Sequence, residues 1–322
     1  MRVLVTGGSG YVGSHAVREL DAAGHDVVIY DNLSTGFRRL STGFNLIEGD
    51  ICDTEKISKC LSGMDAVMHF AASAYVGESV VEPRKYFRNN VEHALTLLDA
   101  VLASSVRIFI FSSTCATYGV PRELPITETC PQDPVNPYGA SKLFFEHMLS
   151  AYAASHGLRY AALRYFNAAG AHASGKIGEI HDPETHLIPL ALKAVMGTKP
   201  PLTVFGKDLD TPDGTCVRDF VHVSDLGGAH VRALDHLASG GASIRLNLGT
   251  GSGTSILQLL AAIKKVTGKE VPHHFAGARA GDPPILYADP TKVKDVLGWS
   301  AKADLEEIVS TAWHWEQELA TS

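Results

Sequence analysis

Short apolar runs rich in β-branched residues alternate with longer amphipathic stretches through the first half of the chain. Short runs bounded by turn residues are typical of buried strands, whereas apolar positions spaced three and four residues apart indicate helices. The expected strands cover residues 3–5, 27–30, 66–70, 107–112 and 160–165. This alternation predicts βαβ units and an α/β fold with a doubly wound parallel sheet, Rossmann-like in type.

Two helices are expected between these strands. The first covers residues 11–23 and ends at Gly24, a residue that tolerates the left-handed backbone of a helix end. The second covers residues 90–104 and carries one apolar stripe formed by Val91, Leu95, Leu98 and Leu102.

The alternation fades after about Asn167 into loops rich in Gly, Pro and His, with helices expected near 187–196, 255–267 and 304–318. We therefore expect a nucleotide-binding domain over 1–167 and a smaller α/β substrate-binding portion over 168–322, with some segments interleaved. A chain of 322 residues, 45% hydrophobic, is long enough for such a core.

The net charge of −7 and the scattered Lys and Arg do not form the basic stripe that a nucleic acid requires. Gly7 and Gly8 interrupt the apolar start of the chain before it reaches the length of a signal-peptide core. No run approaches the roughly 18 apolar residues of a membrane-spanning helix. We expect no nucleic acid or membrane partner and a cytoplasmic location.

The five cysteines are odd in number and contain no Cys-x-x-Cys pair, which argues against a disulfide framework and a zinc site. The 15 histidines include no His-Glu-x-x-His spacing. These patterns predict no metal.

A glycine-rich loop, Gly7-Gly8-Ser9-Gly10-Tyr11-Val12-Gly13, stands between the first expected strand and helix. In that position, glycines let the backbone approach a pyrophosphate at the helix N-terminus. Asp31 ends the second strand about 20 residues later, where a carboxylate accepts the adenosine ribose hydroxyls. Together they predict NAD. Arg38 and Arg39 leave open a role in binding an NADP phosphate, against the simpler interpretation of a solvated pair.

Tyr138 and Lys142 lie one turn apart at the start of an expected helix. An ammonium near a phenol favours the phenolate and makes tyrosine a base for an alcohol. Thr114 ends the strand that precedes them and adds a hydroxyl at the sheet edge. The order of glycine loop, threonine and Tyr-x-x-x-Lys predicts hydride chemistry on an alcohol carbon.

With these motifs, the chain resembles the extended short-chain dehydrogenase/reductase family and, within it, the UDP-glucose 4-epimerases over nearly its whole length. Further runs that carry the resemblance are E-G-D-I at Glu48, N-N-V at Asn89, R-Y-F-N at Arg164, V-R-D-F-V-H-V-S-D-L at Val217 and N-L-G at Asn247.

The resemblance implies roles for individual residues. Tyr138 is the implied base, Thr114 shares its proton path, and Lys142 also binds the nicotinamide ribose. The implied NAD-binding set is Gly7, Gly10, Tyr11, Val12, Gly13, Asp31, Asn32, Asp50, Ile51, Phe70, Ala71, Ala72, Asn89, Tyr138, Lys142 and Tyr165. The implied UDP-sugar-binding set is Thr114, Tyr138, Asn167, Leu187, Phe205, Arg218, Arg279, Asp282 and Leu286.

The implied reaction oxidises C4 of a UDP-hexose to a bound 4-keto sugar and returns hydride to the opposite face. Ala74 stands where several such enzymes have lysine, and Leu286 where they have tyrosine. The smaller Leu286 is expected to leave room for a 2-N-acetyl group, although leucine is equally compatible with simple packing.

Three alternatives remain. A 4,6-dehydratase needs an added acid and base after the strand-end threonine, and Cys115 and Ala116 cannot supply them. A dehydrogenase that releases NADH and a non-catalytic NAD-sensing protein are compatible with parts of the pattern. The resemblance also suggests a homodimer, for which Leu97, Phe144 and Met148 are the candidate apolar contacts.

Overall fold

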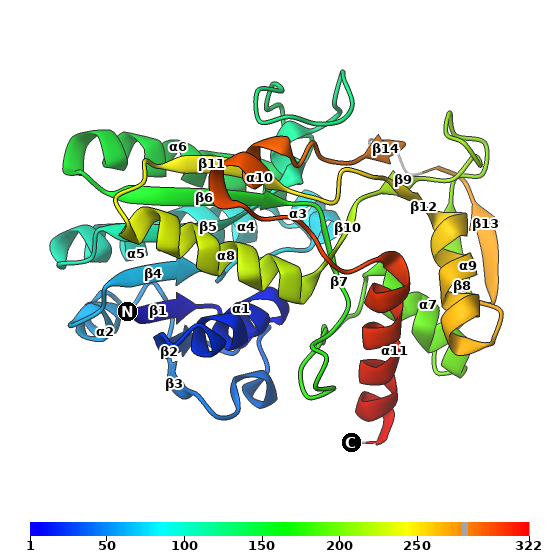
Figure 1. Ribbon diagram of the computed structural model, residues 1–322, viewed down its shortest axis with the longest axis horizontal. Coiled ribbons are helices and arrows are strands. Elements are labelled where there is room, and N and C mark those ends of the chain that lie inside the picture. The colour runs from blue at the N-terminus through cyan, green and yellow to red at the C-terminus, as the bar shows by residue number, and fades with distance from the viewer. Residues whose placement is uncertain (279–282, 322) are drawn as a thin grey trace.

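The computed structural model describes residues 1–278 and 283–321 (Figure 1). Seven parallel strands form the main sheet in the order β11-β6-β5-β4-β1-β2-β3. They are β1 (Arg2–Thr6), β2 (Asp26–Asp31), β3 (Asn45–Glu48), β4 (Ala66–His69), β5 (Ile108–Thr114), β6 (Arg159–Tyr165) and β11 (Ile244–Leu248). The predicted α/β class and parallel sheet are confirmed. The sequence patterns did not reveal β3 and β11.

Side chains alternate between the two faces of the sheet, as the pleat requires. In β1, Val3 and Val5 pack toward one apolar cluster and Leu4 toward the other. The first face is covered by α1 (Tyr11–Ala22), α8 (Val223–Ala238) and α10 (Thr291–Leu297). The second is covered by α2 (Thr54–Leu61), α5 (Ala94–Ala103) and α6 (Pro137–His156). The result is three layers, helix, sheet and helix.

The predicted stripe on the second helix is wrong in part. A wide π-type turn over Arg88–His93 precedes α5, and the residues that α5 buries are Ala94, Leu97, Leu98, Ala100 and Val101. Of the four residues in the predicted stripe, only Leu98 is fully buried. Leu97, which was not part of that stripe, is buried in the core instead. This segment is apolar on two sides, so its periodicity could not decide which side faces the sheet.

The second part of the chain forms a smaller unit on the right of Figure 1. Its helices are α7 (Leu187–Met196), α9 (Ile256–Thr267) and α11 (Leu305–Thr321), which share a third apolar cluster with β8 (Leu202–Phe205). Its other strands are β7 (Asn167–Ala169), β9 (Val217–Arg218), β10 (Phe220–His222), β12 (Thr254–Ser255), β13 (His273–Ala276) and β14 (Ile285–Leu286). The smaller α/β portion is thereby confirmed.

Two elements from this part of the chain, β11 and α8, lie in and on the main sheet. The domain division after residue 167 stays a prediction. Two short helices, α3 (Val76–Val81) and α4 (Pro83–Phe87), lie between β4 and the π-type turn. Among residues 1–278 and 283–321, no helix is long and apolar enough to cross a membrane.

Candidate active site

The strand order reverses between β1 and β4, because the chain moves outward from β1 first through β2 and β3 and later through β4, β5 and β6. Ligands of open α/β sheets bind at the carboxyl ends of the strands beside such a reversal. In register, Thr6 lies beside His69, and Thr114 lies beside Tyr165. The glycine loop and the predicted catalytic residues therefore share one edge of the sheet.

The glycine loop lies against the chain that leaves β4. Gly7 has φ of 75°, and a Cβ placed there would lie 2.4 Å from the amide nitrogen of Ala71. A Cβ on Gly13 would lie 2.2 Å from the carbonyl oxygen of Gly7. Helix α1 begins at Tyr11. Its N-cap residue, Gly10, has no side chain that could accept a hydrogen bond from the amides of the first turn. Backbone amides at this helix start are thus available to a pyrophosphate.

Asp31 is 7% exposed at the end of β2. Its carboxylate accepts hydrogen bonds from the backbone amides of Ser9, at 2.9 Å, and Leu33, at 2.8 Å. Burial raises its pKa, and these two hydrogen bonds oppose that shift. Since a carboxylate has about four acceptor positions, it retains capacity for the ribose hydroxyls.

The two arginines considered for an NADP phosphate already have partners. Arg38 lies 2.5 Å from a carboxylate oxygen of Glu48, and the guanidinium of Arg39 lies 5.0 Å from the ring centre of Trp315. This arrangement favours NAD over NADP.

Asn32, expected at the adenosine ribose, lies after β2 beside the segment after β3 that holds Asp50 and Ile51, expected at the adenine. The amide of Asn32 donates to the carboxylate of Asp50 at 2.8 Å, and Ile51 is 5% exposed. The hydroxyl of Tyr30 donates to the carbonyl of Asp50 at 2.9 Å. The structure therefore brings Asn32, Asp50 and Ile51 to one place.

Phe70, Ala71 and Ala72 follow β4 and are half-buried. The amides of Phe70 and Ala71 both donate to the carbonyl of Thr6, which fixes this segment beside the glycine loop. Asn89 is half-buried, and its amide donates to the side chain of its neighbour Asn90.

Asn90 was missed in the sequence patterns. It is 3% exposed, and its side chain joins the backbone of Ser73 to the hydroxyl of Ser141 on α6. Two adjacent asparagines gave no indication of which one faces the interior. Asn90 therefore ties the segment that follows β4 to α6.

Tyr138 lies near the side chain of Thr114, which is 6% exposed. Burial, and then the nearby Tyr165, raise the pKa of Tyr138 well above its usual value of about 10, while the side chain of Thr114 opposes the shift. The start of α6 fixes the tyrosine, because Asn136 caps the helix by accepting a hydrogen bond from the amide of Gly139.

Lys142 is 3% exposed, and its ammonium donates to the carbonyl oxygen of Ser112 at 2.8 Å. Burial lowers the pKa of Lys142 to about 7, partly offset by the negative charge of Glu146. The hydroxyls of Ser112 and Tyr165 lie 2.5 Å apart. Thus Lys142 and Tyr165 are connected through Ser112, and Thr114 and Tyr138 lie beside them.

Behind this group is a buried charge network that the sequence patterns did not indicate. Arg164 donates to both carboxylate oxygens of Glu146, at 2.9 and 2.6 Å, and the two side chains are each 2% exposed. Glu146 also accepts from Ser113 at 2.5 Å, and Arg164 donates to the hydroxyl of Tyr118 at 2.7 Å. The network joins α6, which carries Tyr138 and Lys142, to the ends of β5 and β6.

The residues predicted to bind the UDP-sugar are more dispersed. Asn167 follows β6 and begins β7, while Arg218 and Leu286 are paired in register between β9 and β14. Leu187 begins α7 and Phe205 ends β8, both in the smaller unit. Arg279 and Asp282 lie outside the described residues.

The sequence has close and full-length relatives. The model of the NAD dependent epimerase/dehydratase family matches residues 3–249. A UDP-glucose 4-epimerase of Azospirillum brasilense is 49% identical over 325 residues, covering 100% of this chain and 93% of its own. The crystal structure of UDP-glucose 4-epimerase from Brucella ovis in complex with NAD matches with a TM-score of 0.96 at 51% identity, covering 98% of each chain.

The chain belongs to the NAD-dependent epimerase/dehydratase family and, within it, to the UDP-glucose 4-epimerases. The predicted resemblance and the predicted cofactor, NAD, are confirmed. A more distant structure, the UDP-Glc/GlcNAc 4-epimerase from Campylobacter jejuni, matches with a TM-score of 0.86 at 38% identity, covering 98% of this chain and 99% of its own. Substrate breadth thus varies among relatives of the same fold.

Proposed function

We propose that the protein interconverts UDP-glucose and its C4 epimer with bound NAD, and that Tyr138 is the catalytic base. The observation that carries the proposal is that Tyr138 lies near the side chain of Thr114 on the end of β5, with the buried ammonium of Lys142 one helical turn away. NAD supplies a hydride acceptor, which afterwards acts as the hydride donor. The protein's residues supply the proton transfer and hold the sugar.

In the forward half of the reaction, the O4 proton passes to Tyr138 as hydride leaves C4, which gives a bound 4-keto sugar. In the second half, hydride returns to the other face of C4 and Tyr138 returns the proton to O4. Without cofactor, burial favours the neutral phenol. The positive charges of oxidised nicotinamide and of Lys142 favour the phenolate instead.

The neighbourhood of Thr114 supports epimerisation over dehydration. Cys115 and Ala116 follow it in a single 3₁₀ turn, Cys115–Tyr118. Burial raises the pKa of the Cys115 thiol to about 12, and a methyl group has no acid or base function. Elimination of water needs an added acid and base, which these two residues do not provide.

NMR of the products formed from UDP-glucose and from UDP-galactose tests this function. We expect both reactions to reach the same mixture, without net accumulation of NADH and without a 4-keto-6-deoxy product. Tyr138→Phe should lower kcat by about 10²- to 10⁴-fold, the usual contribution of a general base, while NAD binding is kept. Accumulation of NADH would identify a dehydrogenase instead, and wild-type turnover by Tyr138→Phe would exclude it as the base.

We further propose that the protein is a homodimer that pairs the faces of α4, α5 and α6. Phe87 is 37% exposed, Phe144 is 52% exposed, and their rings lie 6.1 Å apart. Val91 and Leu95 are half-buried on the side of the π-type turn and α5 that the core leaves open. Leu97 was among the predicted dimer contacts, but its side chain is buried in the core. We therefore propose Phe87, Val91 and Leu95 as contacts in its place. Light scattering of wild type and Phe144→Glu measures the association directly.

A further inference from the structure

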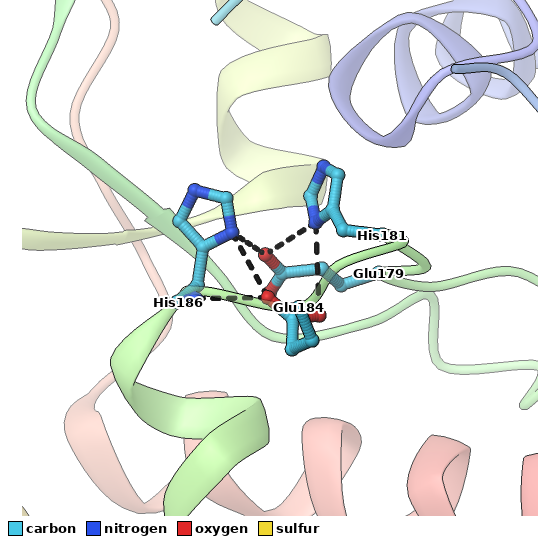
Figure 2. A group of neighbouring side chains, drawn as sticks. All are labelled: Glu179, His181, Glu184 and His186. Atoms are coloured by element: carbon cyan, nitrogen blue, oxygen red, sulfur yellow. Dashed lines mark hydrogen bonds and ion pairs between the residues drawn. The ribbon is translucent and has the colours of Figure 1, made fainter. Parts of the chain in front are cut away.

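Two glutamates and two histidines of the segment before α7 point toward one another (Figure 2). They are Glu179, His181, Glu184 and His186, spaced Glu-x-His-x-x-Glu-x-His. Each offers one nitrogen or oxygen atom, and these four atoms all lie within 4.8 Å of one another. This spacing differs from the His-Glu-x-x-His pattern sought in the sequence, so the group was not considered there.

The separations between these atoms match the size of a metal coordination shell. Nδ1 of His181 lies 3.2 Å from Oε1 of Glu179 and 3.7 Å from Oε2 of Glu184. Nδ1 of His186 lies 2.9 Å and 3.2 Å from the Oε1 atoms of Glu179 and Glu184. Ligands about 2.0–2.1 Å from a tetrahedral zinc ion are about 3.3–3.4 Å apart. Three of the four measured separations are shorter than this range, by 0.4 Å or less, and the fourth, at 3.7 Å, is longer.

The hydrogen bonds of the group are incomplete. Nδ1 of His181 and Oε2 of Glu184 are buried atoms, and neither has a hydrogen-bond partner. The Glu184 side chain is 3% exposed. Leaving such atoms unsatisfied is costly, and native proteins seldom do so. A cation between them would use both lone pairs at once.

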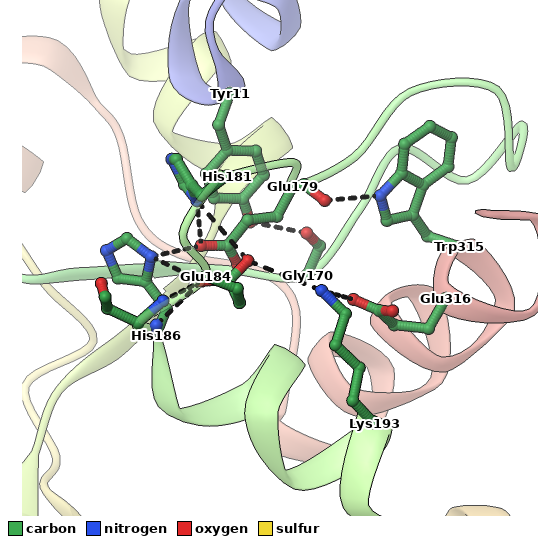
Figure 3. Close-up of polar contacts among 10 residues, drawn as sticks. Tyr11, Gly170, Glu179, His181, Glu184, His186, Lys193, Trp315 and Glu316 are labelled. Carbon is green, nitrogen blue, oxygen red and sulfur yellow. Dashed lines mark hydrogen bonds and ion pairs between the residues drawn. The ribbon is translucent and has the colours of Figure 1, made fainter. Parts of the chain in front are cut away.

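The carboxylates of the group carry an excess of negative charge when the histidines are neutral. With neutral histidines, Glu179 and Glu184 carry a charge of −2. Lys193 on α7 lies 4.0 Å from Oε2 of Glu184 and 3.6 Å from Glu316 on α11, and burial raises the pKa of Glu316 to about 7 (Figure 3). The net charge of these side chains is therefore −2 when Glu316 is ionised and −1 when it is protonated. Two protons on the histidines or one divalent ion would balance it.

The backbone holds the carboxylates in place. The other oxygen of Glu184 accepts hydrogen bonds from the amides of Thr185 and His186, both at 2.8 Å. The indole of Trp315 donates to the carbonyl of Glu179 at 2.8 Å (Figure 3). Such outer contacts orient the ligands of metal sites and raise their affinity.

We propose that Glu179, His181, Glu184 and His186 bind one Zn²⁺ ion. Imidazole and carboxylate ligands suit zinc, and four protein ligands make a closed, structural site. All four come from eight consecutive residues, so that closing the loop around the ion costs little chain entropy.

The ion would fix the segment between the two parts of the molecule. The ring of His181 lies against Tyr11 of α1, with centroids 6.3 Å apart, and against Tyr75, at 5.7 Å. His186 is the N-cap residue of α7. Zinc would therefore hold the start of α7 beside the helix that carries the glycine loop, independently of the reaction catalysed.

Elemental analysis of tag-free protein, stripped by a chelator and then reloaded with Zn²⁺, tests the proposal. We expect about one equivalent of zinc in the wild type and less than about 0.1 in His181→Gln/His186→Gln, because both nitrogen ligands are lost. Zn²⁺ at about 100 times its Kd should raise Tm by about 5 °C or more in the wild type alone.

The matched control is His273→Gln/His274→Gln, which removes the same number of histidines from exposed positions on β13. It should bind zinc like the wild type. Glu184→Gln is a second test, since it keeps the side-chain shape while removing a charge, and it should weaken zinc binding at least tenfold. Absence of zinc from the reloaded wild type would overturn the proposal and leave a proton-held cluster. Equal binding by wild type and the His181/His186 variant would also overturn it.

Discussion

The ammonium of Lys142 donates a 2.8 Å hydrogen bond to the main-chain carbonyl of Ser112, in an interior position that exposes 3% of the residue. A carbonyl stabilises the ammonium less than a carboxylate would, so burial lowers the pKa of Lys142 to about 7. In the protein without ligand, Lys142 is therefore expected to exchange its proton near pH 7.

This arrangement predicts how the stability of the NAD-free protein depends on pH. Lys142 titrates near pH 7 when folded and near 10.5 when unfolded, so between these values the unfolded state holds more protons. Stability relative to Lys142→Met should be constant below pH 7 and rise from pH 7 toward 10.5, by up to about 3 kcal/mol at pH 9.5. Urea unfolding of both proteins at several pH values measures the difference. If the free energies of unfolding of the two proteins differed by the same amount at every pH, the prediction would be contradicted.

The buried pair of Glu146 and Arg164 should contribute strongly to the free energy of unfolding. Glu146→Gln leaves the guanidinium buried without its counter-ion, which costs about 3–5 kcal/mol. Denaturant unfolding measures this loss. The control is Glu55→Gln, which breaks the exposed pair between Glu55 and Lys59 on α2 and should cost less than about 0.5 kcal/mol. Similar losses in both variants would show that the buried network is no more important than a surface pair.

The parts of this site that could be predicted are those encoded by local signals. The loop from Gly7 to Gly13, Asp31 and the Tyr138–Lys142 pair each combine residue types at fixed short spacing with a strand or helix boundary. Such signals identify chemistry without needing tertiary contacts, and the predicted sheet edge follows from the order of strands and helices.

The missed features depend on contacts between distant segments. Glu146 meets Arg164 only because α6 packs against β6, and nothing near either residue in the sequence indicates a partner. Which stripe of α5 is buried depends on the surrounding helices, because both sides are apolar. The Glu179–His186 group was missed for a different reason: its residues are local, but their spacing matched none of the metal motifs considered.

Replacing Gly13 with a residue that has a side chain should weaken NAD binding. A Cβ on Gly13 would lie 2.2 Å from the carbonyl oxygen of Gly7, so Gly13→Ala must move the loop that faces the pyrophosphate. We expect NAD affinity to fall at least about tenfold, which corresponds to about 1.4 kcal/mol. Isothermal titration with NAD measures it. The matched control is Gly228→Ala in α8, where a Cβ meets no atom within 4 Å and NAD affinity should be unchanged.

Leu286 should determine whether the sugar pocket accepts a 2-N-acetyl group. It is half-buried, lies in register with Arg218 across β9 and β14, and packs beside the cluster of Tyr118, Ile126 and Phe166. Leu286→Tyr adds bulk at this border. We expect kcat/KM for UDP-GlcNAc to fall at least about tenfold while that for UDP-glucose changes less than about threefold, since a clash of a few atoms costs about 1–3 kcal/mol.

The conservative variant Leu286→Met separates bulk from disturbance of β14, because it nearly conserves side-chain volume and should leave the ratio of the two kcat/KM values unchanged. Initial rates for both sugars, measured on the same preparations of wild type, Leu286→Tyr and Leu286→Met, give that ratio. An equal loss for both sugars in Leu286→Tyr would mean that the residue supports the strand and not the choice of sugar. No turnover of UDP-GlcNAc by the wild type would end the hypothesis that Leu286 broadens the pocket.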